Sequence, residues 1–331
     1  MKEEYGQSLE KALAATPSGT FELKQHNANH AHTPLLVEHF TTQTEGKGHI
    51  DSFLLFPGIE LSLHRYLAEQ VGFHHAAKDF VLEINYCRKG RIGWNMRNGD
   101  AVYLGAGDLC LHSMASCADS EMALPLGYYE GISITVDLHE LEDNSPEILK
   151  EAGFDPNAVY RKFCVENSPF GVSANHTIDS VFSLLYDLPE QLRIPYYKLK
   201  AQEALLQLLQ IEPNVEKQLT QYGSQQTELI KEVRDFLIQH LDQRFTIEEL
   251  SKKYLLNTSS LKAVFKAVYG MPIASYVKEY RIQQAMKLLR ETDDSIAVIA
   301  EKVGYETQGK FTKAFKERVQ MLPTEYRRLS P

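Results

Sequence analysis

Two short segments in the last third of the chain carry hydroxyl, amide and lysine side chains at helical spacing. The side chains expected to point outward are Thr258, Ser259, Lys262 and Lys266 in the first segment, and Gln308, Lys310, Thr312, Lys313 and Lys316 in the second. Apolar residues recur every three or four positions between them, which places the polar set on the opposite face of each helix. Hydroxyl, amide and cationic groups contact base edges and phosphates, so the chemistry indicated is binding of double-stranded DNA.

The two segments belong to an internal repeat formed by residues 245–271 and 294–321. The pairs that align at an offset of 49 residues are Thr246/Ser295, Ile247/Ile296, Leu250/Ile299 and Ser251/Ala300. The pairs that align at an offset of 50 residues are Asn257/Thr307, Leu261/Phe311, Phe265/Phe315 and Lys266/Lys316. The change of offset means that the turn inside the second copy is one residue longer.

Each copy begins with a hydroxyl residue that can cap a helix, and Thr246 with Glu249 forms a capping box. Asn257 and Thr307 then cap a second helix in each copy. Two helices joined by a tight turn, with the second one exposed, is the plan of a helix-turn-helix. The alternative for a single helix of this kind is a solvated face rich in lysine, but duplication of the unit favours DNA binding.

A single helix is predicted between the two copies, from Pro272 to Arg290. Proline is well suited to the start of a helix, and 19 residues at 1.5 Å each span roughly 28 Å. A connector of this length can hold two second helices about 34 Å apart, which is one turn of the DNA duplex.

With these features, residues 227–331 resemble the tandem helix-turn-helix domain of AraC/XylS-type transcription regulators. The matching features are Ala300, Val303-Gly304-Tyr305, Phe311, Phe315-Lys316, Pro323, Tyr326-Arg327 and the connector residues Arg281-Ile282, Ala285 and Leu288-Leu289. The resemblance covers about a third of the chain. It implies base contacts from the front of each second helix, namely from Ser259, Lys262 and Ala263 and from Gln308, Gly309, Lys310 and Lys313.

The chain departs from this family pattern at three places. Leu255 stands where the family usually has glycine in the first turn, and Gln320 where a glycine normally follows the last helix of the repeat. Ala263 and Gly309 offer no long side chain at positions of base contact. We therefore expect the second copy to discriminate bases more strongly than the first, through Lys310 and Lys313.

The front of the chain is predicted to be rich in β-strands, with a barrel over residues 20–140. The expected strands are Leu35–Phe40, Ile59–Leu67, Phe80–Cys87, Arg91–Met96, Ala101–Leu104, Asp108–His112 and Gly131–Leu138. Short strands at about ten-residue spacing, punctuated by Gly, Asn and Asp, indicate an antiparallel sandwich or barrel. The resemblance implies a cupin-like barrel, since members of the family commonly carry such an N-terminal domain that binds an effector or supports dimerisation.

Two helices should follow the strands, over residues 174–211. Ile178, Val181, Phe182, Leu185 and Leu188 recur at helical spacing before Pro189, and Pro195 is expected to open the second helix. This second helix bears the apolar residues Leu199, Leu205, Leu206, Leu208 and Leu209. Their partner is either the chain's own barrel or the same helix of a second chain.

The predicted organisation is therefore an α+β chain of two domains. Residues 1–215 form an effector-sensing or dimerisation domain, residues 216–226 a linker and residues 227–331 an all-α domain with two helix-turn-helix units. Residues 224–331 hold 18 Lys and Arg against 14 Asp and Glu, a net charge of +4. Subtraction from the chain totals of 35 and 44 leaves 17 and 30 in residues 1–223, a net charge of −13. Such asymmetry indicates domains with different partners.

Candidate effector-binding residues in the front domain are Arg88, Trp94, His112 and Tyr128. Each also has an ordinary interpretation. Arg88 belongs to a basic set around the glycine turn Lys89-Gly90, which suits a solvated hairpin or an anion site. Trp94 suits a core position or a ligand-stacking platform, and Tyr128 a packed strand or a pocket wall.

A metal-dependent cupin enzyme with an added DNA-binding domain is the alternative function. Its ligands would come from His74, His75, Glu83 and His112. Adjacent residues of a strand point to opposite faces, so His74 and His75 cannot both face the interior. No nucleophile or phosphate-loop motif is present, and the four cysteines lack a C-x-x-C pair.

These observations predict a transcription regulator that binds a specific DNA sequence and is controlled by a small-molecule effector. We expect no catalytic residue, metal or cofactor. The expected partners are promoter DNA, the effector, a second copy of the chain and, for an activator, RNA polymerase. No signal peptide or stretch of 18 apolar residues is seen, so a cytoplasmic protein is expected. An effector-independent DNA-binding protein is a further alternative.

Overall fold

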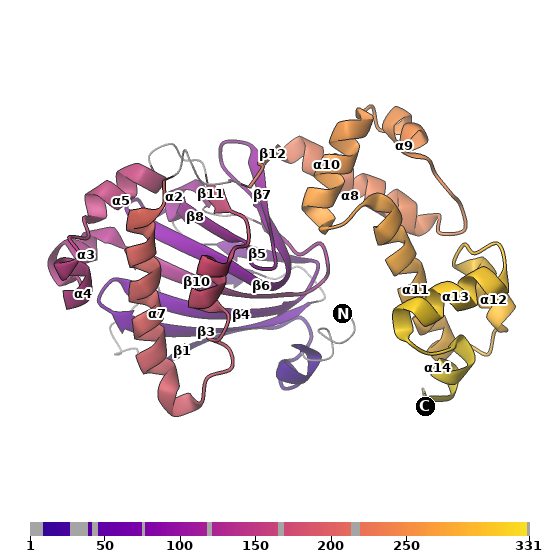
Figure 1. Ribbon diagram of the computed structural model, residues 1–331, viewed down its shortest axis with the longest axis horizontal. Coiled ribbons are helices and arrows are strands. Elements are labelled where there is room, and N and C mark those ends of the chain that lie inside the picture. Colours follow the sequence, from indigo (N-terminus) through magenta and orange to yellow (C-terminus); the bar gives the residue numbers. More distant parts are fainter. Residues whose placement is uncertain are drawn as a thin grey trace. The chain divides into compact units, whose positions relative to one another are not determined.

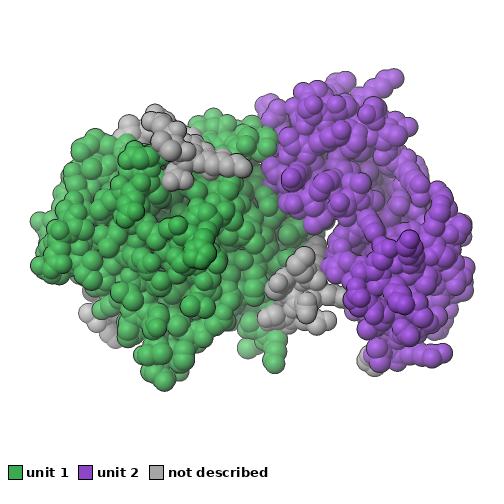
Figure 2. Space-filling model, viewed as in Figure 1, with its two compact units in different colours: residues 1–224 green, residues 225–331 purple. Residues whose placement is uncertain are grey.

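The computed structural model describes residues 9–26, 39–41, 46–74, 77–117, 121–164, 169–212 and 219–329. It divides into two compact units, Met1–Ser224 and Gln225–Pro331 (Figures 1 and 2). The first unit combines a curved sheet with helices, and the second consists of helices. This is the α+β arrangement expected from the sequence, with a half-barrel in the first unit.

The strands described in the first unit form one sheet. They are β1 (Phe21–His26), β2 (His39–Thr41), β3 (Lys47–Phe56), β4 (Ile59–Leu67), β5 (Gln70–His74), β6 (Val81–Asn95), β7 (Asp100–Gly105), β8 (Leu109–Ser113), β9 (Glu121–Ala123), β10 (Tyr129–Asp137), β11 (Phe170–Val172) and β12 (Tyr222–Gly223). Along the main path their order is β1-β3-β4-β10-β6-β9-β5-β2, while β7 and β8 also pair with β6. β1 lies parallel to β3, and the other pairs are antiparallel.

Strand β6 corrects the expectation of two strands joined by a hairpin at Lys89-Gly90. It is one strand of 15 residues that passes through Gly90, pairing first with β10 and β8 and then with β7 and β9. Gly90 has a φ of 82°, and a Cβ there would overlap the carbonyl oxygen of Tyr128. The glycine therefore allows the strand to bend from one part of the sheet into the other, rather than to reverse.

The predicted strand Ile59–Leu67 is β4. Strands β7, β8 and β10 overlap the predicted strands Ala101–Leu104, Asp108–His112 and Gly131–Leu138. Most of the predicted strand Leu35–Phe40 falls outside the described residues. The sequence prediction missed β3, a ten-residue strand whose residues Ile50, Phe53 and Leu55 are buried.

The helices of the first unit are α2 (Met114–Cys117), α3 (Leu138–Asn144), α4 (Glu147–Glu151), α5 (Pro156–Phe163), α6 (His176–Phe182) and α7 (Glu190–Gln210). α3, α5 and α7 contact strands of the sheet, and Figure 1 shows α7 crossing it. One apolar core of this unit lies between these helices and one sheet face, and a second buried apolar cluster includes Ile50, Ile92 and Trp94. On that face are Leu61, Ile84 and Ile134, which pack with Val181 of α6 and Leu205 of α7.

Helix α7 begins at Glu190, so the prediction that Pro195 opens it was wrong. Pro189 is the N-cap, and Pro195 lies inside the helix. The preceding helix, α6, ends at Phe182 and not at Pro189. Leu205 and Leu208 of α7 are buried against the core of their own unit, while the side chain of Leu199 is 54% exposed.

The second unit contains α8 (Ser224–Gln239, whose first residue belongs to the first unit), α9 (Ile247–Lys253), α10 (Thr258–Tyr269), α11 (Ile273–Glu291), α12 (Ile296–Lys302), α13 (Gln308–Val319) and α14 (Pro323–Leu329). The predicted caps are all in place: Thr246 with Glu249 at α9, Asn257 at α10, Ser295 at α12 and Thr307 at α13. Pro272 is the N-cap of α11, as its position predicted.

Candidate nucleic-acid interface

The first helix pair, α9 and α10, meets through a tight turn at Leu255. Leu255 has a φ of 54°, and the next amide, of Leu256, donates to the carbonyl of Ser251 at 3.1 Å. Asn257 then caps α10 by accepting from the amide of Ser260 at 2.7 Å. This short route fixes the direction in which α10 leaves the turn.

The apolar stripe of α10 is buried, as its spacing predicted: Leu261, Val264, Phe265 and Val268 are at most 3% exposed. The predicted contact residues Ser259, Lys262, Ala263 and Lys266 are exposed on the opposite side, and Thr258 is partly exposed. α10 therefore presents two lysines and one hydroxyl on a free helix face.

The second pair, α12 and α13, repeats this geometry. Gly304 has a φ of 80°, and the amide of Tyr305 donates to the carbonyl of Ala300 at 2.9 Å. Thr307 caps α13 through the amide of Lys310 at 3.2 Å. Phe311 and Phe315 are buried in the core, and Val319 is partly buried against it. The exposed residues of α13 include the predicted set Gln308, Gly309, Lys310, Lys313 and Lys316.

Glu306 is the extra residue of the second turn. Leu256 and Tyr305 are equivalent at an offset of 49, while the caps Asn257 and Thr307 differ by 50, so the insertion lies between Tyr305 and Thr307. The Glu306 carboxylate is hydrogen-bonded to the ammonium of Lys310 and lies 3.1 Å from the guanidinium of Arg244. The hydrogen bond from Lys310, followed by the charge of Arg244, lowers the pKa of Glu306.

Glu306 and Arg244 were not among the residues predicted from the sequence. The longer second turn was the available signal, because an inserted residue directly before a recognition helix lies close to the side chains that helix exposes. The carboxylate therefore contacts Lys310, one of the residues predicted to face DNA, and lies close to Arg244.

Arg281 of α11 joins the two helix pairs. Its guanidinium donates to the carbonyls of Leu241 at 2.5 Å and of Gln243 at 2.9 Å, in the segment that leads to α9. It also lies over the ring of Tyr305, 6.0 Å from its centroid, in the turn of the second pair. A Cβ on Gly304 would overlap the carbonyl oxygen of Leu241. Close packing at this junction ties the position of α13 to that of α9.

The corner after α13 has the same backbone form as the corner after α10, although its residue differs. Gly270 and Gln320 are the C-caps, with φ values of 78° and 62°. Gln320 therefore takes the left-handed conformation that the resemblance assigns to a glycine. The family geometry is kept here at the cost of backbone strain.

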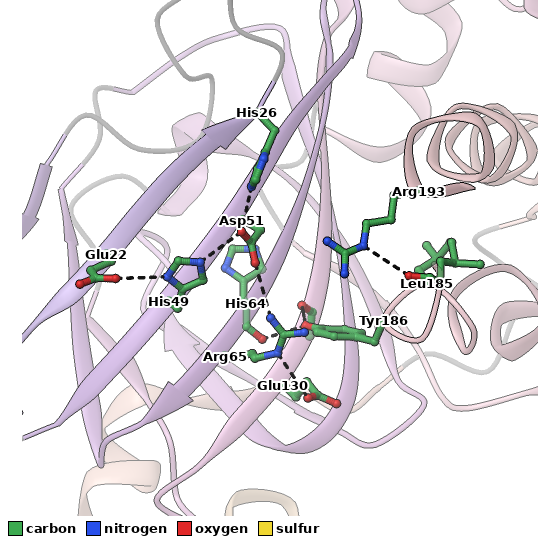
Figure 3. A network of polar contacts seen from close by, with 12 residues as sticks. Glu22, His26, His49, Asp51, His64, Arg65, Glu130, Leu185, Tyr186 and Arg193 are labelled. Carbon is green, nitrogen blue, oxygen red and sulfur yellow. Dashed lines mark hydrogen bonds and ion pairs between the residues drawn. The ribbon is translucent and has the colours of Figure 1, made fainter. Parts of the chain in front are cut away.

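The predicted effector residues lie on different faces of the sheet in the first unit. Arg88 contacts Glu130 and Asp187, each at 2.5 Å, and packs over the ring of Tyr186 at 4.7 Å. Figure 3 shows Arg65, Glu130 and Tyr186 in this polar network on the helix-covered face. Arg88 is thus engaged in ion pairs, and the interpretation as part of a hairpin turn was wrong.

Trp94 and His112 lie together on the other face, with ring centroids 5.5 Å apart. His112 is 2% exposed, and its Nε2 lies 3.2 Å from the amide nitrogen of Asn85 and 3.6 Å from the carboxylate of Glu83. Tyr128 is 8% exposed and packs beside Gly90.

The residues of the alternative enzyme do not form a metal centre within the part of the chain that the structure describes. No group of three histidine, cysteine or acidic side chains suited to a metal is found among those residues. Glu83 and His112 are neighbours, but the side chain of His74 and the whole of His75 lie outside the described residues. The described cysteines Cys87, Cys110 and Cys164 are buried free thiols, and burial raises the pKa of Cys164 to about 12.

None of the described helices is both long and apolar enough to span a membrane.

Known proteins match the helical part of the chain. The model of a family described as a helix-turn-helix domain matches residues 250–329. The transcriptional activator RhaR of Mannheimia succiniciproducens is 35% identical over 91 residues, which are 28% of this chain and 33% of RhaR. The TetD protein of transposon Tn10 from Escherichia coli is 32% identical over 102 residues, which are 31% of this chain and 74% of TetD.

Among solved structures, the C-terminal domain of the response regulator yesN from Fusobacterium nucleatum is 31% identical. The match covers 29% of this chain and 95% of that domain, with a TM-score of 0.28. The match spans about a third of the length of RhaR and of the melibiose operon regulatory protein of Escherichia coli. The matched helix-turn-helix segment and the share of TetD that is covered establish that this chain belongs to the AraC family of helix-turn-helix proteins.

Proposed function

We propose that the chain is a transcription regulator that binds a specific DNA sequence through two helix-turn-helix units. α10 and α13 are the recognition helices. The observation that carries this proposal is the pair of exposed faces with the same cap and turn geometry, one bearing Lys262 and Lys266 and the other Lys310, Lys313 and Lys316. Lysines and polar groups on an exposed helix suit both the phosphates and the base edges of a major groove.

The length of α11 supports the use of both helices on one face of DNA. Its 19 residues span about 28 Å, close to the roughly 34 Å of one duplex turn. Sequence discrimination rests mainly on α13, because Ala263 of α10 is too short to reach a base while Lys310 and Lys313 are long.

The first unit is proposed to be a cupin-like sensor for a small-molecule effector. An effector changes DNA binding only if it binds two states of the chain with different affinity. The exposed side chains of Leu192, Tyr196 and Leu199 on α7 are available for a second copy of the chain. An activator of this type would also contact RNA polymerase. We place the protein in the cytoplasm, where promoter DNA lies.

The test is binding of the full chain to a DNA fragment from upstream of its own gene, against scrambled competitor at two salt concentrations. Binding should resist the competitor and weaken with salt, because lysines displace counterions from phosphates. The Lys310→Ala/Lys313→Ala variant should lose the preference, whereas Lys287→Ala, a lysine of α11 outside the recognition helices, should keep it.

If the upstream fragment shows no preference, selection of bound fragments from the whole genome follows. Failure of that selection to enrich any sequence, with and without a library of effectors, would defeat the proposed function. Loss of specific binding in Lys262→Ala but not in Lys310→Ala/Lys313→Ala would instead reverse the proposed order of the two recognition helices.

A further inference from the structure

Residues 219–224, in the segment predicted to link the two units, are attached to the sheet of the first unit. Tyr222 and Gly223 form β12, which pairs antiparallel with Ala101 and Asp100 of β7 (Figure 1). On its other side β7 pairs with β6. The segment therefore extends the sheet by one short strand along β7, in the manner of a peptide that adds to a sheet edge.

Hydrogen bonds hold this segment at both of its ends. At its start the amide of Leu219 donates to the carbonyl of Gly171 at 2.7 Å. At its end the amide and the hydroxyl of Ser224 both donate to the carbonyl of Gly99, each at 2.9 Å. Ser224 is also the first residue of α8. The last attachment to the sheet and the start of α8 therefore coincide at one residue.

Little apolar surface holds the segment on the sheet. Leu219 packs against the buried cluster that includes Ile92 and Trp94, but its own side chain is only partly buried. Tyr222 is partly exposed and Thr220 is exposed. Segments with few buried apolar contacts open at a low free-energy cost compared with the core of a protein. We therefore expect the segment to exchange between an attached and a detached state.

Detachment would lengthen the connection between the two units. Residues 211–223, which are 13 residues, separate the end of α7 from the start of α8. Fully extended, at about 3.4 Å per residue, they span up to roughly 45 Å. In the attached state only three positions separate Ser224 from Thr227, the first buried residue of α8. The two states therefore differ in how far the first unit can move away from the DNA-binding unit.

The distribution of charge makes this distance important for DNA binding. Residues 1–223 hold 17 Lys and Arg against 30 Asp and Glu, a net charge of −13. Such a unit repels the phosphates of DNA, and the repulsion is screened over a length of about 10 Å at 0.1 M salt. A short connection keeps the acidic unit near DNA that the helical unit has bound. A long connection allows it to withdraw beyond the screening length.

We propose that residues 219–224 are an inhibitory strap. While the strap is docked on β7, it weakens DNA binding by keeping the acidic first unit close to the DNA-binding unit. Release of the strap lengthens the connection and relieves the repulsion. The inference rests on the proposed function only in that the chain binds DNA. It does not require a particular DNA sequence, because every sequence carries the same phosphates.

A disulfide locks the strap in its docked state. Because Ser224 donates to Gly99, the neighbouring pair of Gly223 and Asp100 is of the kind that exchanges no hydrogen bonds, with Cα atoms about 4.5 Å apart. That spacing suits a disulfide. The full chain with Gly223→Cys/Asp100→Cys is therefore compared in its oxidised and reduced forms. The unchanged chain, whose described cysteines are buried, is treated with the same oxidant as a control.

A proline releases the strap. The pair of Tyr222 and Ala101 is of the kind that exchanges two hydrogen bonds, and Tyr222→Pro removes the amide hydrogen that one of them needs. The matched control is Tyr222→Ala, which keeps this amide. Hydrogen exchange at the amides of Ala101 and Ser224 measures docking without DNA, and it should be faster in Tyr222→Pro only. Exchange at Ser224 of the unchanged chain as fast as in an unfolded peptide overturns the proposal.

The affinity for DNA is measured by fluorescence anisotropy with a labelled duplex of mixed sequence, at about 50 mM and about 300 mM salt. At the lower salt concentration the oxidised lock should bind about three- to tenfold more weakly than the same variant reduced. Tyr222→Pro should bind about threefold more tightly than Tyr222→Ala. Both ratios should approach one at the higher salt concentration, because screening removes the repulsion.

Three results of this experiment overturn the proposal. They are equal affinities of the locked and reduced forms at the lower salt concentration, tighter binding by the locked form, and a difference between the two forms that salt does not reduce. The last result would assign the inhibition to steric blocking rather than to charge.

Failure of the strap and failure of the proposed function are distinguishable. Sequence-specific DNA binding with equal affinity in the locked and released chains overturns the strap and leaves the regulator intact. A salt-dependent difference between these chains, in a protein that prefers no DNA sequence, supports the strap and overturns the proposed function. Absence of DNA binding in every variant overturns both.

Discussion

The carboxylate of Glu306 lies 3.1 Å from the guanidinium of Arg244. The two residues are 62 positions apart in the chain, Arg244 before α9 and Glu306 directly before Thr307, the N-cap of α13. The same carboxylate holds the ammonium of Lys310, one of the residues proposed to contact DNA. The side chains of all three are more than half exposed. Approach of a phosphate would therefore compete with Glu306 for both cations.

The first prediction concerns this carboxylate. Glu306→Gln should raise the affinity for DNA about two- to fivefold, because it removes a negative charge and releases Arg244 and Lys310 for phosphates. The slope of log affinity against log salt concentration should become steeper by an amount that corresponds to about one to two additional phosphate contacts. Fluorescence anisotropy with a labelled duplex at several salt concentrations measures both effects.

The matched control for this experiment is Glu228→Gln, which changes an exposed acid that pairs with Lys231 on α8. It removes the same charge away from the recognition helices and should leave the salt dependence unchanged. Weaker binding in Glu306→Gln would mean that the carboxylate itself reads a base, for example a cytosine amino group.

The second prediction concerns the strained turn of the first helix pair. Leu255 adopts a left-handed φ of 54° while its side chain is 92% exposed and contributes little packing. Leu255→Gly should stabilise the helical unit by about 0.5–1 kcal/mol, since relief of the left-handed penalty exceeds the entropic cost of glycine. Urea unfolding followed by far-ultraviolet circular dichroism measures the change. A lower unfolding midpoint would show that Leu255 packs in the folded chain.

The third prediction is the opposite behaviour of the equivalent position, Gly304. Gly304→Ala should destabilise the helical unit by more than about 2 kcal/mol, because the left-handed backbone is strained and the new Cβ would overlap the carbonyl oxygen of Leu241. The control is Gly309→Ala in the first turn of α13, where a Cβ meets nothing within 4 Å. That variant should not lower the midpoint. Equal midpoints for the two alanine variants would contradict the close contact at Gly304.

The fourth prediction is a pH dependence of the first unit that comes from Asp51. His26 and His49 lie 2.9 and 3.1 Å from one oxygen of Asp51, and Arg65 lies 3.5 Å from the other (Figure 3). Burial by itself would raise the pKa of Asp51, but the hydrogen bonds from the two histidines lower it to about 2. The hydrogen bond to Asp51 in turn raises the pKa of His49, with a smaller contribution from Glu22, and outweighs burial.

The sign of the effect follows from these two shifts. The contribution of His49 to stability is complete below its unfolded pKa of about 6.5 and is lost as the pH rises through the raised folded value. The contribution of Asp51 is present above about pH 3.9 and is lost as the pH falls toward 2.

The thermal midpoint of the first unit, followed by Trp94 fluorescence, should therefore fall as the pH rises from about 6 to 8.5. Asp51→Asn should reduce this fall. An identical pH profile in Asp51→Asn and the unchanged chain would show that His49 does not gain stability from Asp51.

Local signals allowed the helical unit to be predicted closely. Thr246, Asn257, Ser295 and Thr307 cap helices through bonds to amides only three residues ahead, so the sequence near each cap is enough to locate it. The buried stripe of α10 followed from its 3.6-residue period for the same reason. The resemblance also singled out Arg281 as a connector residue, although not its burial or its contacts with Leu241 and Gln243.

Non-local contacts explain where the prediction failed. The segment around Lys89-Gly90 looks like a hairpin turn, but the carbonyl of Tyr128, about 40 residues away, meets Gly90 inside a continuous strand. Helix α7 begins before Pro195 because Ile194 and Tyr197 pack on the core. Local rules for proline do not take such packing into account.

The alternating pattern Glu60-Leu61-Ser62-Leu63-His64 was enough to indicate a strand with one polar and one apolar face. In an antiparallel sheet such a pattern usually predicts a polar face in water. Only the tertiary structure decided that this face is buried and that Glu60, Thr135, Glu83 and His112 stand in one row. Strand periodicity is a property of neighbouring residues, whereas register and burial depend on segments that meet only when the chain has folded.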